Sequence, residues 1–385
     1  MVRTIFRVEM FLQMHKRKFF LRANSPMVLL SALKSYLIYY AIPICLLSCE
    51  FKGSEMRANR LIALKSTNTN LMMPDSVSKF IQAALDTMRK YSIFTDSIDW
   101  SEMRRISVAD ARGAQIYSQT YYALDQALIR LDDHHSFLKT PSEVRQWLGA
   151  GEGAYPYQKP HGKMKDDRIA WISVPTFSSG DSLLCLQFAS ELQSVIKQFD
   201  KKNPVGWLVN LEFNRGGNMW PMLVGLGPLF AKEGKMGGFL SAFGECTMWS
   251  YANGVATAGS EVMLEIPHPY KVSDLARPIA VMVSDRTASS AEAVLISLSC
   301  QENVKTFGIP TAGLSTANAE FFLKDSTSLV ITTALMTDVE CRPYGGKIIP
   351  QVNLEKNFLY NVGYRQQKPL EWIGETTMNS SKAKF

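Results

Sequence analysis

Cysteine is scarce in this sequence, and its spacing is irregular. The 385 residues include six cysteines, none of which stands in a Cys-x-x-Cys pair or at the spacing of a metal-binding motif. The sequence therefore gives no indication of a structural metal site. Disulfides are possible if the protein leaves the cytoplasm, but no cysteine spacing requires one.

An excess of basic charge is also missing from most of the chain. The formal net charge is +7, but seven of the 42 Lys and Arg residues and only one acid, Glu9, fall within residues 1–48. The rest of the chain carries about +1, which is too little for a basic surface that follows a phosphate backbone. We therefore expect no nucleic-acid partner.

Two groups of well-known motifs are absent. No Gly-x-Gly-x-x-Gly and no Walker lysine pattern is present, so binding of dinucleotides or nucleotide phosphates is not supported. The Gly-x-Ser-x-Gly elbow of α/β-hydrolases is missing as well, which argues against that class of acyl hydrolase. The sequence predicts no cofactor.

Residues 1–48 have the features of a lipoprotein signal peptide. An uncharged apolar run at 35–47 follows Lys34 and is too short to cross a bilayer comfortably. It ends in Leu46-Leu47-Ser48-Cys49, which resembles a bacterial lipobox with Cys49 as the lipidated first residue of the mature protein. An uncleaved membrane anchor is the alternative. The lipobox predicts a lipid-anchored protein on the periplasmic or extracellular side of a bacterial membrane, with residues 49–70 as a flexible tether.

The remaining chain predicts three regions. Helical periodicity indicates a small helical module at residues 71–140, which begins with an amphipathic helix at 75–89. Residues 141–360 alternate strands, hairpins and helices, which is typical of an α/β core. Residues 361–385 are polar and are predicted to be a frayed C-terminal tail.

Ser289 lies in a predicted turn between a strand and a helix. The run Thr287-Ala288-Ser289-Ser290-Ala291-Glu292 follows the apolar strand at 277–285 and precedes apolar helical residues. The unpaired N–H groups and the dipole of a helix N-terminus suit a nucleophile at this position. Ser289 and Glu292 also have the spacing of a capping box, so an ordinary helix cap is the alternative.

A second polar cluster, Asp132-Asp133-His134-His135, follows the last helix of the module. Adjacent residues on a turn point in different directions and seldom chelate one ion, so we expect no metal there. A solvated helix end would also account for the cluster. The third interpretation is a histidine that a loop delivers as a general base.

Three segments, in this order, resemble the tail-specific (C-terminal processing) serine peptidases. They are residues 131–138, residues 209–220 with the paired Gly216 and Gly217, and residues 287–292. The resemblance is closest to the compact nisin-resistance branch, because the chain between His135 and the strand at 168 is too short for a PDZ domain. It implies a ClpP/crotonase-like α/β core of layered ββα repeats.

The resemblance also implies roles for individual residues. Ser289 would be the nucleophile and His135 its general base, and the backbone N–H groups of Gly216, Gly217 and Ser290 would hold the oxyanion. The implied substrate is an extended or unstructured peptide or protein tail, cut near its C-terminus by a serine-type endopeptidase.

Three departures from the family pattern bear on activity. Leu314 stands where some branches carry a catalytic lysine, which leaves the histidine-dependent mechanism. Asn210-Leu211-Glu212 replaces the usual Asp-Leu-Arg before the glycine turn. Glu340 is the only acid at residues 340–348, the region that supplies the acid orienting the histidine in related enzymes. A degenerate peptidase fold that binds peptides without cutting them is therefore the alternative function.

Overall fold

The computed structural model describes residues 59–150, 157–354 and 362–382. Residues from Ser66 onward form one compact unit. The predicted signal peptide and the predicted lipidation site, Cys49, lie outside the described residues. Within the predicted tether, residues 59–63 are helical, because Arg60, Leu61 and Ala63 are good helix formers. None of the helices in the described part of the chain is long and apolar enough to cross a membrane.

The helical module consists of α3 (Asp75–Tyr91), α4 (Trp100–Asp110) and α5 (Tyr121–Ile129), with short 3-10 helices at Thr95–Ser97 and Tyr117–Thr120. Helix α3 follows the predicted periodicity, and its apolar face is buried: Val77, Phe80, Ile81, Ala84, Leu85 and Met88. Asp99 caps α4 by accepting hydrogen bonds from the N–H groups of Ser101 and Glu102. The module packs onto the core through contacts of α3 with β12 and of α5 with β1.

The first sheet of the core has the strand order β13-β10-β9-β4-β3-β2. Strands β3, β4, β9, β10 and β13 are parallel, and β2 is an antiparallel edge strand. Their bounds are β2 His161–Lys165, β3 Ile169–Ser173, β4 Gly206–Asn210, β9 Ile279–Val283, β10 Val304–Gly308 and β13 Val352–Asn353. Every residue of β9 is buried, as expected for a parallel strand that is covered on both faces.

The second sheet has the order β1-β12-β5-β6-β7-β8, and β11 pairs with the other edge of β12. The bounds are β1 Phe137–Lys139, β5 Gly234–Ser241, β6 Cys246–Ala252, β7 Val255–Ala258, β8 Glu261–Glu265, β11 Thr316–Phe322 and β12 Ser328–Thr337. Strand β1 lies antiparallel to β12, with Phe137 opposite Val330. This pairing fixes the segment that begins two residues after His135.

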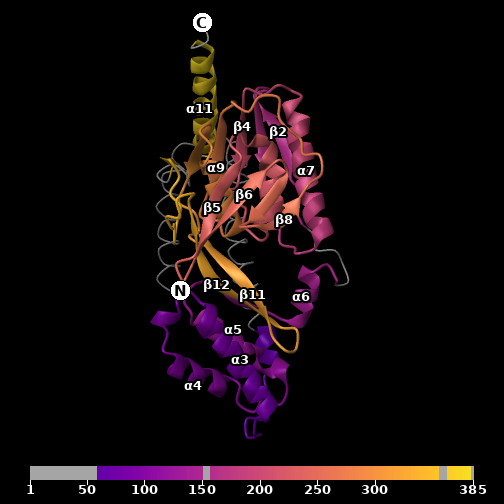
Figure 1. The fold of residues 1–385 in the computed structure, drawn as a ribbon, viewed down its shortest axis with the longest axis vertical. Coiled ribbons are helices and arrows are strands. Elements are labelled where there is room, and N and C mark those ends of the chain that lie inside the picture. The colour runs from indigo at the N-terminus through magenta and orange to yellow at the C-terminus, as the bar shows by residue number, and fades with distance from the viewer. Residues whose placement is uncertain (1–58, 151–156, 355–361, 383–385) are drawn as a thin grey trace, which may run out of the picture. The chain divides into compact units, whose positions relative to one another are not determined.

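Helices α7 (Ser182–Asp200), α8 (Met219–Leu226) and α9 (Ser290–Ser299) lie between the two sheets (Figure 1). Helices α7 and α9 contact β3 and β10 of the first sheet, while α8 and α9 contact β7, β8 and β5 of the second. One apolar core joins these layers and includes Trp207 of β4 and Trp249 of β6, both almost fully buried. A short helix, α6 (Pro141–Trp147), follows β1, and a 3-10 helix, Gly227–Leu229, follows α8. The predicted α/β core is confirmed.

The prediction of a frayed tail at 361–385 is wrong for most of its length. Residues Val362–Lys382 form helix α11, which contacts β4 and β9 on the face of the first sheet opposite the other helices. Ile373 is fully buried there and packs with Leu208, Ala280 and Met282. Few apolar residues, spaced one helical turn apart among polar ones, are enough to dock a helix, and this pattern is weak in the sequence.

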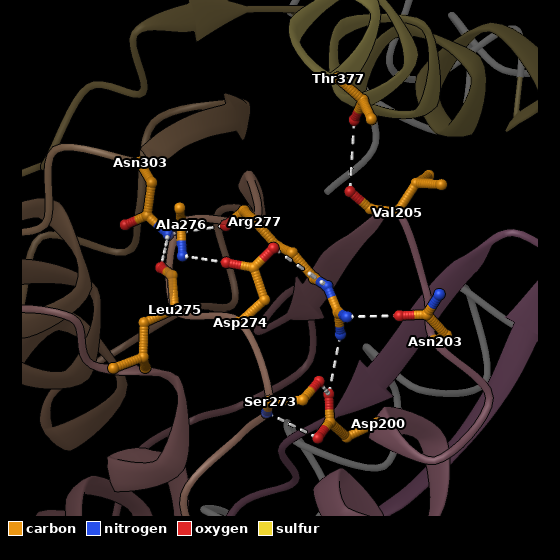
Figure 2. Close-up of polar contacts among 10 residues, drawn as sticks. All are labelled: Asp200, Asn203, Val205, Ser273, Asp274, Leu275, Ala276, Arg277, Asn303 and Thr377. Carbon is orange, nitrogen blue, oxygen red and sulfur yellow. Dashed lines mark hydrogen bonds and ion pairs between the residues drawn. The ribbon is translucent and has the colours of Figure 1, made fainter. Parts of the chain in front are cut away.

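A buried ion pair joins the end of α7 to the start of β9 (Figure 2). The Arg277 guanidinium donates to Asp200 Oδ1 at 2.8 Å and to Asn203 Oδ1 at 2.6 Å. Asp200 also accepts hydrogen bonds from the N–H and hydroxyl groups of Ser273 and from the Tyr270 hydroxyl. Burial acts to raise the pKa of Asp200, but these hydrogen bonds and the arginine charge lower it overall.

The Asp200→Asn variant should lose about 3–5 kcal/mol of unfolding free energy, because it leaves the Arg277 cation buried without its carboxylate. Urea unfolding followed by circular dichroism measures this change. Asp274→Asn is the matched control, since Asp274 lies 3.8 Å from the same guanidinium but is about half exposed. We expect a change of about 0–1 kcal/mol for the control. Equal losses in the two variants would contradict a dominant role of the buried pair.

Candidate active site

Ser289 directly precedes helix α9 and has a strained backbone. Its φ of 55° and ψ of −122° fall outside the regions that side-chain-bearing residues favour, at a cost on the order of 1–3 kcal/mol. Glu292 accepts a hydrogen bond from the Ser289 N–H at 2.8 Å, which is the glutamate half of a capping box. The Ser289 hydroxyl is turned instead toward a histidine. The helix-cap and nucleophile interpretations therefore coexist at this residue.

The histidine is His135, and its Nε2 lies 2.9 Å from Ser289 Oγ. Asp133 shapes the loop that carries it, because its carboxylate accepts hydrogen bonds from the backbone N–H groups of His135 and Ser136. The Asn318 side chain donates to the His135 carbonyl oxygen at 2.9 Å. His134 points elsewhere: its side chain is 79% exposed and lies 3.6 Å from Asp132. Of the two adjacent histidines, only His135 reaches the serine.

The second ring nitrogen of His135 faces a hydroxyl group. Nδ1 lies 2.7 Å from Thr316 Oγ1, at the start of β11. Glu340, the acid considered from the sequence, is an exposed residue that pairs with Arg342 at 2.9 Å. A carboxylate would accept only and would fix the proton on Nδ1, whereas a threonine hydroxyl both donates and accepts and permits either tautomer. The tautomer that can act on Ser289 carries its proton on Nδ1 and donates it to Thr316.

The surroundings of His135 keep the ring neutral. Burial lowers the pKa of His135 to about 4, and the nearby Asp133 carboxylate only partly opposes this effect. At neutral pH the imidazole is therefore unprotonated and free to accept a proton. The same burial raises the free energy of the imidazolium that would form during proton transfer. Thr316 does not offset this rise, because its hydroxyl carries no negative charge.

The glycine turn after β4 lies against the Ser289 turn. A Cβ atom on Gly216, whose φ is +90°, would come within 2.6 Å of the Ala288 carbonyl oxygen and 2.8 Å of the Ser290 nitrogen, so only glycine fits. The Ser290 hydroxyl donates to the Gly217 carbonyl at 2.7 Å and joins the two turns. Among the described residues, the N–H groups of Gly217 and Ser290 have no protein acceptor.

The prediction that the Gly216 N–H is an oxyanion donor is wrong. Its N–H donates to Asn214 Oδ1 at 2.8 Å and is therefore already engaged. Asn214 is fully buried, and its amide donates to the carbonyl oxygens of Val174 and Pro175. Asn214 thus supports the glycine turn. Asn214 stands directly before Arg215-Gly216-Gly217, but nothing in the sequence around it indicates this supporting role.

Metal and thiol chemistry find no support in the described part of the chain. No group of three or more His, Cys, Asp or Glu residues there could hold a metal ion. Burial raises the pKa of the free thiols Cys185 and Cys300 to about 11, so neither is a reactive thiolate at neutral pH. In contrast to these thiols, the Ser289 hydroxyl has a base beside it, the His135 ring.

Cys246 of β6 and Cys341, which follows β12, form a disulfide. The two cysteines are 95 positions apart in the sequence, so their spacing does not predict the pairing. The loop after Cys341 reaches the site, because the N–H and carbonyl groups of Gly346 both bond to the Ser315 hydroxyl, next to Thr316. The disulfide therefore anchors the loop that bonds to Ser315, the neighbour of Thr316.

Replacing both Cys246 and Cys341 by serine should lower the free energy of unfolding by about 2–5 kcal/mol, because the cross-link closes a long loop in the unfolded chain. Chemical unfolding under non-reducing conditions measures the difference. Cys300→Ser is the control, since Cys300 is a free thiol and should change stability far less. A parent protein that is equally stable with and without a reducing agent would contradict the prediction.

The profile described as "Peptidase family S41" matches residues 168–354. Residues 168–354 are a peptidase family S41 domain. The matched S41 residues include Ser289 and the Gly216-Gly217 turn, whereas His135 precedes them. The assignment of His135 to the site therefore depends on the geometry above.

Two relatives agree with this S41 assignment. The nisin-resistance protein of Lactococcus lactis subsp. lactis is 28% identical over 271 residues, which cover 69% of this chain and 80% of that protein. The carboxy-terminal processing protease CtpA of Bacillus subtilis (strain 168) is 29% identical over 202 residues, which cover 52% of this chain and 38% of that protein. The S41 resemblance seen in the sequence is confirmed.

Solved structures show the same fold. A lipoprotein from Streptococcus agalactiae superposes with a TM-score of 0.64 at 22% identity, over 80% of this chain and 99% of that one. The photosystem II D1 C-terminal processing protease superposes with a TM-score of 0.51 at 13% identity, over 73% of this chain and 94% of that one. The fold shared with these structures therefore extends beyond residues 168–354.

Proposed function

We propose that this protein is a serine peptidase that cleaves extended or unstructured peptides by an acyl-enzyme mechanism. Ser289 attacks the peptide carbonyl carbon while His135 Nε2 removes the hydroxyl proton. The same histidine returns that proton to the leaving amine, and water then hydrolyses the acyl-enzyme. The N–H groups of Gly217 and Ser290 stabilise the oxyanion.

One observation carries this proposal: the contact of 2.9 Å between His135 Nε2 and Ser289 Oγ. Beside it are two backbone N–H groups, of Gly217 and Ser290, that have no acceptor in the described ranges of the chain. A nucleophile within hydrogen-bond reach of a base, next to a pair of backbone donors, is the arrangement that acyl transfer needs. Burial keeps the His135 ring neutral at physiological pH, so its Nε2 is available to accept the proton of Ser289.

We further propose that cleavage occurs near the C-terminus of the substrate and outside the cytoplasm, with the protein held to a bacterial membrane by lipid on Cys49. The name of the Bacillus subtilis relative supports C-terminal processing. The disulfide between Cys246 and Cys341 supports an oxidising compartment, since such bonds are rare in the cytosol. Cys49→Ala should release the protein from membranes, and retention in the membrane fraction would favour an uncleaved helix.

The decisive test is labelling of the protein from Cys49 onward with a fluorescent fluorophosphonate, which reacts with activated serines. We expect one labelled site in the parent and none in Ser289→Ala. Labelling that persists in Ser289→Ala would show that another serine is the nucleophile. Hydrolysis of fluorescein-labelled casein, an unstructured protein, should follow the same pattern.

The second candidate function is peptide binding without cleavage. The uncharged Thr316 partner of His135 favours it, because the hydroxyl at Nδ1 carries no negative charge that would stabilise the imidazolium as an orienting acid does. An unlabelled parent that still binds unstructured peptides would select this function over catalysis.

A further inference from the structure

A single buried carboxylate connects the two halves of the site. Glu292, in the first turn of α9, is fully buried. Its Oε2 accepts the Ser289 N–H at 2.8 Å. Its Oε1 accepts the Thr311 hydroxyl at 2.5 Å and the Gly313 N–H at 3.1 Å, and the Leu314 N–H donates to the carboxylate as well.

Three of the groups that donate to Glu292 belong to the segment that orients His135. Thr311, Gly313 and Leu314 lie between β10 and β11, and β11 begins at Thr316, the residue that contacts His135 Nδ1. Glu292 thus holds the backbone of Ser289 with one oxygen and the approach to Thr316 with the other. The position of the serine relative to its base is set from both sides by one side chain.

The hydrogen-bond pattern requires a carboxylate at this position. Thr311 Oγ1 accepts the N–H of Ile348 at 2.8 Å, so its single proton is directed to Glu292. Each of the four partners of Glu292 therefore donates, which suits an ionised carboxylate because it only accepts. Burial raises the pKa of this carboxyl group above its ordinary value, and the hydrogen bonds oppose the rise. A glutamine amide has the same shape but would direct an NH₂ group at another donor.

We propose that Glu292 is a positioning residue that holds Ser289 in its strained conformation and in register with His135. The expected change in reaction rates rests on the proposed function, whereas the expected change in the Ser289 backbone does not. It assigns to Glu292 more than helix capping: without its carboxylate, the Ser289 backbone relaxes to negative φ and the contact of 2.9 Å with His135 Nε2 is lost.

The test compares Glu292→Gln with Glu143→Gln. Glu143 occupies the same place in another capping box, where it accepts the Thr140 N–H at the start of α6. It is remote from Ser289 in the sequence, and in the described part of the chain it makes no hydrogen bond to His135 or Thr316. We expect fluorophosphonate labelling to slow about 10- to 100-fold in Glu292→Gln, as for a small misplacement of a reacting group, and to stay unchanged in Glu143→Gln. With casein, kcat should fall in Glu292→Gln while KM stays the same.

A second pair of variants covers the case in which Glu292→Gln fails to fold. Thr311→Val keeps the shape of the side chain but removes the hydroxyl, and Thr311→Ser restores it. Labelling should be about tenfold slower in Thr311→Val than in Thr311→Ser. Equal rates in these two variants, or a Glu292→Gln protein that is labelled as fast as the parent, would overturn the inference while leaving the serine peptidase proposal intact.

A crystal structure of Glu292→Gln separates the two proposals completely. A negative φ at Ser289 and a lost contact with His135 would support the positioning role even if the parent were never labelled. An unchanged Ser289 conformation would overturn the role whatever the parent does. Failure of the parent to react would count against the proposed function alone.

Discussion

The His135→Ala variant should react with a fluorophosphonate about 10⁴- to 10⁶-fold more slowly than the parent, which is the range seen when the base of a serine peptidase is removed. The reason is geometric, since Nε2 is the proton acceptor at 2.9 Å from Ser289 Oγ. With the ring gone, the serine hydroxyl keeps its proton at neutral pH and remains a weak nucleophile. The second-order rate constant of labelling measures the loss without knowledge of the natural substrate.

His134→Ala is the control, because this neighbour has the same chemistry in a different place. Its side chain is largely exposed and lies beside Asp132. We expect labelling of His134→Ala within about twofold of the parent. If the two variants lost reactivity equally, the loop as a whole and not the ring of His135 would be the important feature.

The Thr316→Asp variant should shift the pH dependence of labelling. In the parent, the reactive form of His135 is neutral, and its pKa is about 4. Reactivity should therefore rise with pH through a midpoint near pH 4 and stay level above it. A carboxylate beside Nδ1 favours the protonated ring and raises its pKa by about 1–3 units. The midpoint should move up by the same amount. At pH 5 the variant should therefore reach a smaller fraction of its own plateau rate than the parent reaches of its plateau rate.

The plateau at high pH should change in the opposite direction. An aspartate at position 316 fixes the proton on Nδ1 and stabilises the imidazolium that forms as Ser289 attacks, so we expect a plateau at least about tenfold above the parent. Thr316→Asn isolates the effect of the charge, because it has nearly the same shape and should leave the midpoint where it is. A midpoint that is identical in the Asp and Asn variants would show that residue 316 does not face the ring.

Much of the fold could be predicted because its elements have strong local patterns. The six buried positions of α3 recur at helical spacing, and β9 is apolar throughout. The turn at Ser289 follows from the order of a buried strand, small polar residues and an apolar helix. Helix α11 was missed because its docking depends on Ile373 and a few neighbours among polar residues.

The site was harder to complete from sequence because its remaining members are identified only by their contacts. Thr316 is an ordinary threonine until the fold brings it to within 2.7 Å of His135 Nδ1. Gly216 was predicted as an oxyanion donor, but the Asn214 side chain occupies its N–H. The family resemblance implies an acid as the partner of the histidine, and Glu340 is the only acid at residues 340–348, whereas the partner in the structure is the Thr316 hydroxyl.

The antiparallel pairing of β1 with β12 determines when the site can assemble during biosynthesis. Phe137, two residues after His135, lies opposite Val330, so nearly two hundred residues separate the strands that position the base. Contacts of such long sequence separation form late, after the intervening chain has collapsed. As the chain is synthesised from its N-terminus, Ser289 is made before β12 and has no base in place. The growing polypeptide is therefore expected to be harmless to itself and to its neighbours until it has folded.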